Sequence, residues 1–326
     1  MTPDGRKVAV AWLSVVSNTT LIVLKVVVGV LIGSVSVISE AIHSGVDLLA
    51  SVIALFAVKS SASPADERHP FGHGKVENIS GTIEALLIFL AAGWIVYEAA
   101  KKFVHPTPIE APFWGVTVML FSAVANGVIS HLLFRVGRET ESVALQADAW
   151  HLRTDVYTSV GVMVGLALIG VGDAILPHLG DSLHLIDPLA AMVVAGLIVK
   201  AAWKMTIKSA RDLMDVNLPQ EEAWIAQMLE TFRPAVHGFH RMRTRRSGST
   251  RFVDFHIFVD GGMSVAASHR LAHEISRRIQ DRFVGSNVTV HVEPCNGNCD
   301  HTCRTGCLLS EAERQAVRRA RADERD

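Results

Sequence analysis

Six long apolar stretches occupy the chain before residue 210. They cover residues 8–32, 36–58, 79–100, 112–134, 143–170 and 184–206, and they are rich in Val, Ala, Leu, Ile and Gly. The hydrocarbon core of a bilayer is about 30 Å thick, and roughly 20 helical residues are needed to cross it. A soluble helix of this length would carry a polar face, which most of these stretches lack. The pattern therefore predicts a multi-pass α-helical membrane domain with six transmembrane helices over residues 1–210.

The pattern changes after a linker at residues 211–218. Apolar and polar residues alternate along 250–260, as they do in a strand with one buried face. We expect helices at 219–232 and 264–284 and strands at 237–246, 250–260 and 287–293. This α-β-β-α-β order predicts a C-terminal cytoplasmic α+β domain of the ferredoxin or metallochaperone type at residues 219–294. Residues 295–326 form a Cys-rich and charged tail, and we expect its end, 308–326, to be solvated or a frayed helix.

The composition agrees with a membrane protein. Only 19% of the 326 residues are charged, whereas about 25% are charged in a typical soluble protein. The chain is apolar enough to fold, which excludes a disordered protein. A net charge of −1 and an aromatic content of 6% give no support to a nucleic-acid partner, and we expect none.

Basic residues in the short loops predict the orientation. Cytoplasmic loops are enriched in Lys and Arg. Such residues gather at the N-terminus and at every second loop, namely Arg6, Lys7, Lys59, Arg68, Lys75, Arg135, Arg138, Lys204, Lys208 and Arg211. Lys101 and Lys102 are the exception, and their side chains can extend to the interface. We therefore predict that the chain spans the inner cell membrane with both termini in the cytoplasm.

Two of the apolar stretches contain a His-x-x-x-Asp motif. The second holds His43 and Asp47, and the fifth holds His151 and Asp155. Residues four apart lie on one face of a helix, so each motif presents an imidazole and a carboxylate together. Two such faces opposed in a bundle give a set of two nitrogen and two oxygen ligands, which suits Zn²⁺. The alternative is two separate His–Asp pairs that hold helices together.

These features resemble the cation diffusion facilitator family of divalent-metal/proton antiporters. The resemblance covers residues 8 to about 294 and includes the paired motifs, the His-Pro-Phe-Gly-His-Gly-Lys run at 69–75 and the α-β-β-α-β domain. It implies that His43, Asp47, His151 and Asp155 form the transport site for the metal. Many bacterial members carry an aspartate in place of His43, and the histidine version resembles zinc-preferring members.

The resemblance implies further sites. Asp66, His69 and His73 would form a lower-affinity metal site in the loop after the second helix, although a solvated polar loop is the alternative. Lys75 and Asp215 would form an ion pair at the dimer interface. A binuclear zinc site at the cytoplasmic dimer interface would be lined by His240, His256, His269, His291 and Glu293. Family members usually carry the shorter aspartate at the position of Glu293.

The tail contains an unusual run of cysteines. Cys295, Cys299, Cys303 and Cys307 recur every four residues, with His301 among them. This spacing differs from zinc-finger knuckles and is too local for a disulfide framework. The thiols could bind one soft ion such as Zn²⁺ or Cu⁺, or they could be redox-active or incidental cysteines.

The sequence thus predicts an exporter that exchanges Zn²⁺ for protons by alternating access, acting as a homodimer in the lipid bilayer. Metal binding requires neutral imidazole and ionised carboxylate, so protons and metal compete for one site. The transported ion could instead be Co²⁺, Fe²⁺, Cd²⁺ or Ni²⁺, or the protein could be a non-transporting metal sensor or partner subunit. We expect no enzyme, because the sequence lacks the HExxH motif of a membrane metalloprotease.

Overall fold

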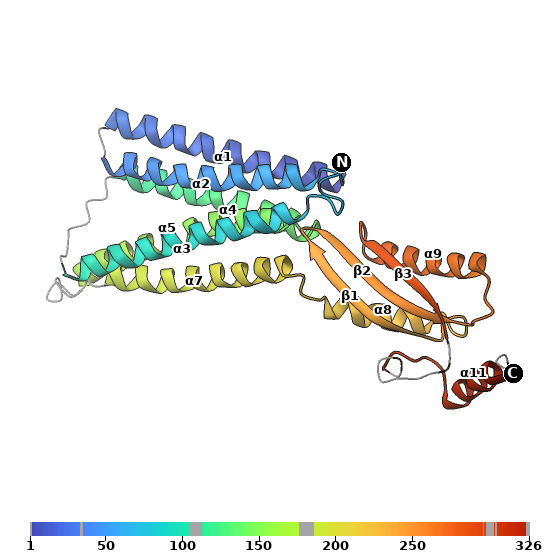
Figure 1. Cartoon of the computed structure of the whole chain (residues 1–326). Coiled ribbons are helices and arrows are strands. Elements are labelled where there is room, and N and C mark those ends of the chain that lie inside the picture. Colours follow the sequence, from blue (N-terminus) through green and yellow to red (C-terminus); the bar gives the residue numbers. More distant parts are fainter. Residues whose placement is uncertain are drawn as a thin grey trace. The chain divides into compact units, whose positions relative to one another are not determined.

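The computed structural model describes residues 2–32, 35–104, 113–175, 186–295, 297, 303 and 305–323. The chain divides into two compact units, Met1–Arg211 and Asp212–Asp326 (Figure 1). The helical bundle and the small sheet lie in separate units, which we describe in turn.

The described part of the first unit consists of long helices at the six predicted positions. They are α1 (Pro3–Ile32), α2 (Val35–Ser61), α3 (Lys75–Val104), α4 (Phe113–Glu139), α5 (Val143–Ile175) and α7 (Ile186–Leu213). Each helix contains most of its predicted apolar stretch, which confirms the helical fold class. Three described segments, Pro3–Val28, Lys75–Lys101 and Leu120–Glu139, are long and apolar enough to cross a membrane, and they support part of the predicted set of spans.

Helices α2 and α5 lie at the centre of the bundle. Helix α2 packs against α1, α3 and α5, and helix α5 also packs against α3 and α4. Small side chains allow this close approach, because Ala144, Ala147 and Ala149 of α5 are completely buried. The two helices that carry the His-x-x-x-Asp motifs are therefore in contact.

A buried carboxylate ties four helix ends together. Glu77, in the first turn of α3, has no exposed surface. Its Oε1 atom accepts hydrogen bonds from Ser61 Oγ at 2.8 Å and Lys7 Nζ at 3.4 Å. Its Oε2 atom accepts from Ser142 Oγ at 2.6 Å and the Val143 amide at 2.9 Å. Each oxygen accepts two hydrogen bonds, which offset the free energy cost of burying the charge.

The second unit contains a sheet of three strands with helices packed on one face. The elements are α8 (Pro219–Glu230), β1 (Gly238–Ser247), β2 (Thr250–Val259), α9 (Val265–Arg282) and β3 (Asn287–Pro294), in the predicted order (Figure 1). Strand β2 is central, antiparallel to β1 and parallel to β3. The apolar side chains of β2, such as Phe255 and Ile257, form a core with Ile225 of α8 and Ile275 of α9. The alternate side chains of β2 therefore lie on the opposite face of the sheet.

The last described segment is a capped helix. We expected a solvated tail or a frayed helix, and the structure shows α11 (Glu311–Asp323) with most of its residues exposed. Its first turn is a capping box, in which the Glu313 amide donates to Ser310 Oγ at 3.3 Å and the Ser310 amide donates to Glu313 Oε2 at 2.6 Å. Glu313 also lies 3.0 Å from Arg233, so the helix is anchored to the domain.

Candidate metal sites

The first candidate site lies between α2 and α5. Asp47 Oδ1 is 3.2 Å from His151 Nε2, and both residues are only 4% exposed. Asp155 follows His151 by one turn, and one ligand atom from each of the three residues lies within 4.8 Å of the other two. The packing of α2 against α5 therefore brings the two motifs together. His43 is one turn before Asp47 on α2, and its side chain lies outside the described part of the structure.

Polar side chains from neighbouring helices support this site. Asn18 of α1 donates to the carbonyl oxygen of Asp47 at 3.4 Å and to Ser51 Oγ at 2.7 Å. Ser51 Oγ in turn donates to Asp148 Oδ1 at 2.9 Å. This chain of hydrogen bonds fixes the position of the α2 backbone beside the site.

Three buried charged residues near the motifs were not predicted as functional. Lys25 of α1 donates to Ser44 Oγ at 2.7 Å, and Ser44 lies between the two ligand positions of α2. Glu84 of α3 and Asp148 of α5 are completely buried. The sequence feature that could have identified them is an ionisable residue within an apolar stretch. Burying such a side chain in a membrane costs free energy, so its presence indicates a function.

The second candidate site is a compact loop between α2 and α3. The carboxylate of Asp66 accepts hydrogen bonds from the amides of Arg68 at 2.9 Å and His69 at 2.6 Å. Mainly through the His69 amide, these bonds hold the pKa of the Asp66 carboxyl below its usual value. His73 Nε2 lies 3.4 Å from Asp66 Oδ2, and ligand atoms of Asp66, His69 and His73 lie within 4.8 Å of one another. Asp66 and His69 are exposed, and His73 is partly buried.

The third candidate site is a row of residues on the open face of the sheet. His240 of β1 pairs with His256 of β2, which pairs with His291 of β3. Because directly paired residues share a face, the three imidazoles lie side by side. Glu293 follows His291 by two residues and is on the same face, 2.7 Å from His256 Nδ1 and 3.1 Å from His240 Nε2. A β-bulge follows His240, where Arg241 has a φ of 50°.

Electrostatics keep the carboxylate of this site ionised. Burial acts to raise the pKa of the Glu293 carboxyl, but its hydrogen bonds with His256 and His240 outweigh burial and leave the pKa below its usual value. Ligand atoms of His240, His256 and Glu293 lie within 4.8 Å of one another. His291 Nε2 is 3.6 Å from Glu293 Oε1, at the edge of the cluster.

Two other predicted groups lie elsewhere. His269 is exposed on α9, where the centroid of its ring lies 6.4 Å from that of His273. It is not among the described ligand sets of three. Lys75 is in the first unit and Asp215 is in the second, where Asp215 lies 3.6 Å from Arg245. The Lys75–Asp215 ion pair remains a prediction.

The cysteines of the tail are partly described. Cys295, Cys303 and Cys307 are thiols and not disulfides in the described part of the chain. Cys299 and His301 lie outside the described residues. The described thiols belong to none of the ligand sets above.

Comparison with known proteins decides the family. The family described as the cation efflux transmembrane domain matches residues 11–214. The cation efflux protein cytoplasmic domain matches residues 218–295. The chain belongs to the cation efflux family. This is the cation diffusion facilitator family that the motifs resemble, so the resemblance is confirmed.

Two relatives are similar to this chain over most of its length, and a solved domain is similar to a quarter of it. An uncharacterized transporter of Synechocystis, sll1263, is 36% identical over 265 residues, which are 80% of this chain and 82% of the relative. The cation-efflux pump FieF of Cronobacter sakazakii is 31% identical over 278 residues, 85% of this chain and 89% of the relative. A solved metal-bound C-terminal domain of the CzcD transporter from Thermotoga maritima is 40% identical, covers 25% of this chain and 93% of its own, and has a TM-score of 0.23.

Membership in the cation efflux family establishes the general activity. The protein is a multi-pass membrane transporter that exports divalent metal cations, and it is not an enzyme. The buried Asp47–His151–Asp155 cluster lies within the matched transmembrane domain, and the His240–His256–Glu293 cluster lies within the matched cytoplasmic domain.

Proposed function

We propose that the protein is a homodimeric exporter of Zn²⁺ that exchanges the metal for protons through the Asp47–His151–Asp155 site. His43 completes a set of two imidazoles and two carboxylates. The observation that carries the proposal is the close grouping of Asp47, His151 and Asp155 on the two central helices. Mixed nitrogen and oxygen ligands favour Zn²⁺, whereas sites made only of oxygen favour harder ions.

The same ligands account for coupling to protons. A metal ion binds neutral imidazole and ionised carboxylate, so its arrival displaces protons from the site. Histidine suits this exchange because its imidazole can hold either a proton or a metal ion. When the site opens to the outer side, protons compete with the metal and release it. Metal moves outward and protons move inward because both occupy one site in turn.

The other two clusters have supporting roles in this proposal. The Asp66–His69–His73 loop binds metal first, on the cytoplasmic side of the membrane. Both termini lie on the same side. The His240–His256–Glu293 cluster is on the face of the sheet opposite its helices, and we assign it to a metal-stabilised contact between two cytoplasmic domains. His291 lies beside it, whereas His269 would have to join from outside the cluster. Lys75 and Asp215 would add an ion pair to this dimer.

Transport by reconstituted protein tests the proposal. Proteoliposomes with one dye for zinc and one for pH report the ion and the counter-ion together. We expect zinc flux coupled to opposite proton flux, and we expect Asp155→Ala to abolish both. Asp281→Ala, which removes an exposed carboxylate of α9, is the matched control and retains both fluxes.

The test also separates the alternatives. Faster flux of Fe²⁺, Co²⁺, Cd²⁺ or Ni²⁺ than of Zn²⁺ under competition would replace zinc as the cargo. Zinc binding without any flux would identify a sensor or partner subunit. Zinc flux that persists in Asp155→Ala would disprove the proposed site.

A further inference from the structure

The cysteine-rich tail folds back on the sheet beside the histidine row. The Phe239 amide donates to the carbonyl of Gly306 at 3.0 Å, and the Leu308 amide donates to the carbonyl of His237 at 2.9 Å. Between them, Cys307 forms an antiparallel bridge with Gly238. The tail therefore pairs with the edge of β1 through an isolated antiparallel bridge.

Glycine is required for this close approach. A Cβ atom added to Gly306 would lie 1.9 Å from the carbonyl oxygen of Phe239, a distance that no side chain can occupy. Gly297 has a φ of 75°, and an added Cβ would lie 2.9 Å from Cγ of Arg318. Arg318 Nε also donates to the carbonyl of Gly297 at 2.9 Å. The two glycines of the cysteine run thus serve tight contacts with β1 and α11.

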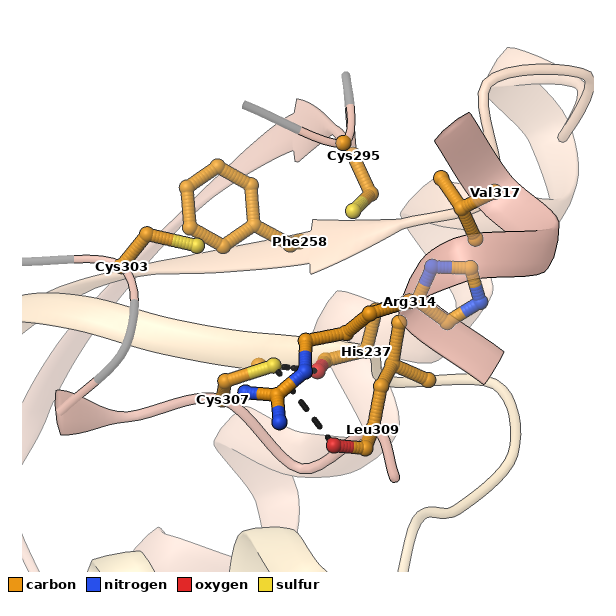
Figure 2. Close-up of a pocket in the computed structure, with 10 residues that line it drawn as sticks. His237, Phe258, Cys295, Cys303, Cys307, Leu309, Arg314 and Val317 are labelled. Carbon is orange, nitrogen blue, oxygen red and sulfur yellow. Dashed lines mark hydrogen bonds between the residues drawn. The ribbon is translucent and has the colours of Figure 1, made fainter. Parts of the chain in front are cut away.

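The folded tail creates a pocket that contains all three described thiols. Figure 2 shows Cys295, Cys303 and Cys307 of the tail around it, together with Phe258, Arg314 and Val317. The Cys295 amide donates to the carbonyl of Val259 at 2.8 Å, so the backbone of Cys295 is fixed to β2. Cys307 is fixed by the bridge to β1. Two of the thiols therefore come from anchored positions, and Cys303 lies between them in sequence.

The pocket is next to the histidine row on the same face of the sheet. Gly238 of β1, Phe258 of β2 and Glu293 of β3 are paired across the sheet. Each lies two residues along its own strand from a histidine of the row, so the two sets are adjacent on one face. Phe258, which lines the pocket, stacks on His240 with their centroids 4.6 Å apart. Cys295 follows Glu293 by two residues. Phe258 therefore contacts the histidine cluster and also lines the pocket of the thiols.

Two polar groups of the pocket are suited to a bound ion. The Nδ1 atom of His237 is buried and has no hydrogen-bond partner among the described residues. A nitrogen of this kind is an acceptable ligand for Zn²⁺ and for Cu⁺. The guanidinium of Arg314, which is paired with Glu311, also lines the pocket, and a neighbouring positive charge favours the thiolate form of a cysteine.

We infer that Cys295, Cys303 and Cys307 form a second metal site of the cytoplasmic domain, which takes a thiophilic d¹⁰ ion, Zn²⁺ or Cu⁺. The site goes beyond the proposed transport function and does not depend on it. The described thiols are further apart than the ligand atoms of the three clusters above. Binding therefore requires the three thiols to move closer together, and His237 is a further nitrogen-bearing residue that lines the pocket.

Cobalt spectroscopy of the full-length protein in detergent tests the inference. Co²⁺ substitutes for Zn²⁺, and only thiolate ligands give it strong near-ultraviolet charge-transfer absorption, so the histidine and transport sites remain silent. We expect this absorption in the reduced protein and its loss in Cys295→Ser/Cys303→Ser/Cys307→Ser. The matched control, His240→Ala/His256→Ala, removes neighbouring ligands and retains the absorption. If added Zn²⁺ displaces Co²⁺ and removes this absorption, zinc is an ion that the site binds.

Copper binding is measured in parallel. Retention of Cu⁺ against a chromophoric chelator, lost in the triple variant, identifies copper instead. Should the triple variant fail to fold, Cys303→Ser alone is expected to weaken the cobalt band, because it removes one of the three thiolates and leaves Cys295 and Cys307 in place. A reduced protein that shows neither cobalt–thiolate absorption nor Cu⁺ retention overturns the inference, as does a triple variant that is indistinguishable from the parent.

Discussion

At the residue scale, buried charges in the bundle fall into two kinds. Glu77 has four hydrogen bonds from three other helix ends or loops, and its charge is fully compensated by Lys7 and neutral donors. Asp47 and His151 contact each other, while the buried Nδ1 of His151 has no described partner. A carboxylate whose oxygens all accept hydrogen bonds stabilises the fold. A cluster of acceptors in which an atom has no hydrogen-bond partner can instead bind a cation.

We expect Glu77→Ala to destabilise the bundle strongly. It would leave the Lys7 ammonium, only 2% exposed, without its buried counter-charge, although Asp4 remains 2.9 Å away. Loss of one partner of a buried ion pair costs about 3–5 kcal/mol. Thermal unfolding in detergent measures the change as a lower midpoint.

The control for this experiment is Glu139→Ala. Glu139 also forms ion pairs, with Arg6 and Arg135, but its side chain is 41% exposed. Exposed ion pairs contribute about 0–1 kcal/mol, so the midpoint should barely move. Equal effects of the two variants would contradict the distinction between them.

At the scale of elements, one helix contains two glycines with opposite surroundings. A Cβ atom added to Gly81 of α3 would lie 2.8 Å from Val143 Cγ1 and 3.0 Å from Ser209 Oγ. A Cβ added to Gly93 would meet nothing within 4 Å. Gly81 therefore marks the point at which α3 approaches α5 and α7, and the central position of α5 depends on it.

We expect Gly81→Ala to destabilise the bundle and Gly93→Ala to leave it unchanged or slightly more stable. Overpacking a tight contact costs about 1–3 kcal/mol. Alanine at an open helical position instead gains about 0.5–1 kcal/mol over glycine, because the unfolded chain loses freedom. Thermal unfolding of both variants measures the difference. If Gly93→Ala is the more damaging of the two, the inferred helix contact is wrong.

At the scale of the whole molecule, the two units carry different metal sites. The transport cluster is in the helical unit, and the His240–His256–Glu293 cluster is in the sheet unit. Each unit has its own core, so a change in one metal site can be measured in its own unit. Glu293 of β3 contacts His240 of β1 and His256 of β2. An ion bound by these three residues would stabilise the contacts between the strands.

We expect zinc to protect the sheet unit from local unfolding, and chelation to remove this protection. An ion at a hundred times its Kd stabilises the bound state by about 2.7 kcal/mol, which slows exchange through unfolding about a hundredfold. Hydrogen exchange of β2 and β3 in the full chain, with and without Zn²⁺, measures the effect.

Two variants make this experiment specific. Glu293→Ala should abolish the zinc-dependent protection, because Glu293 contacts two histidines of the cluster. His273→Ala, which removes an exposed histidine of α9, should retain it. Protection that survives in Glu293→Ala would place the stabilising ion elsewhere.

Much of the fold could be predicted from the sequence, because its causes are local. Long apolar stretches form helices that need no partner to satisfy their backbone, and alternation along 250–260 fixes which face of β2 is buried. The motif spacing of four likewise places Asp155 one turn from His151 before any helix packs. The predicted helices, strands and element order are therefore confirmed, together with the family.

Tertiary structure alone decided which residues meet. The pairing register of the strands joined His240, His256 and His291 in one row, while His269 lies exposed on its helix. Helix packing selected Glu77 as a junction and buried Lys25, Glu84 and Asp148 near the central helices. The return of the tail to β1 gathered the described thiols around one pocket. Sequence determines the period and polarity of each element, but contacts between distant residues depend on register and packing, which no local pattern encodes.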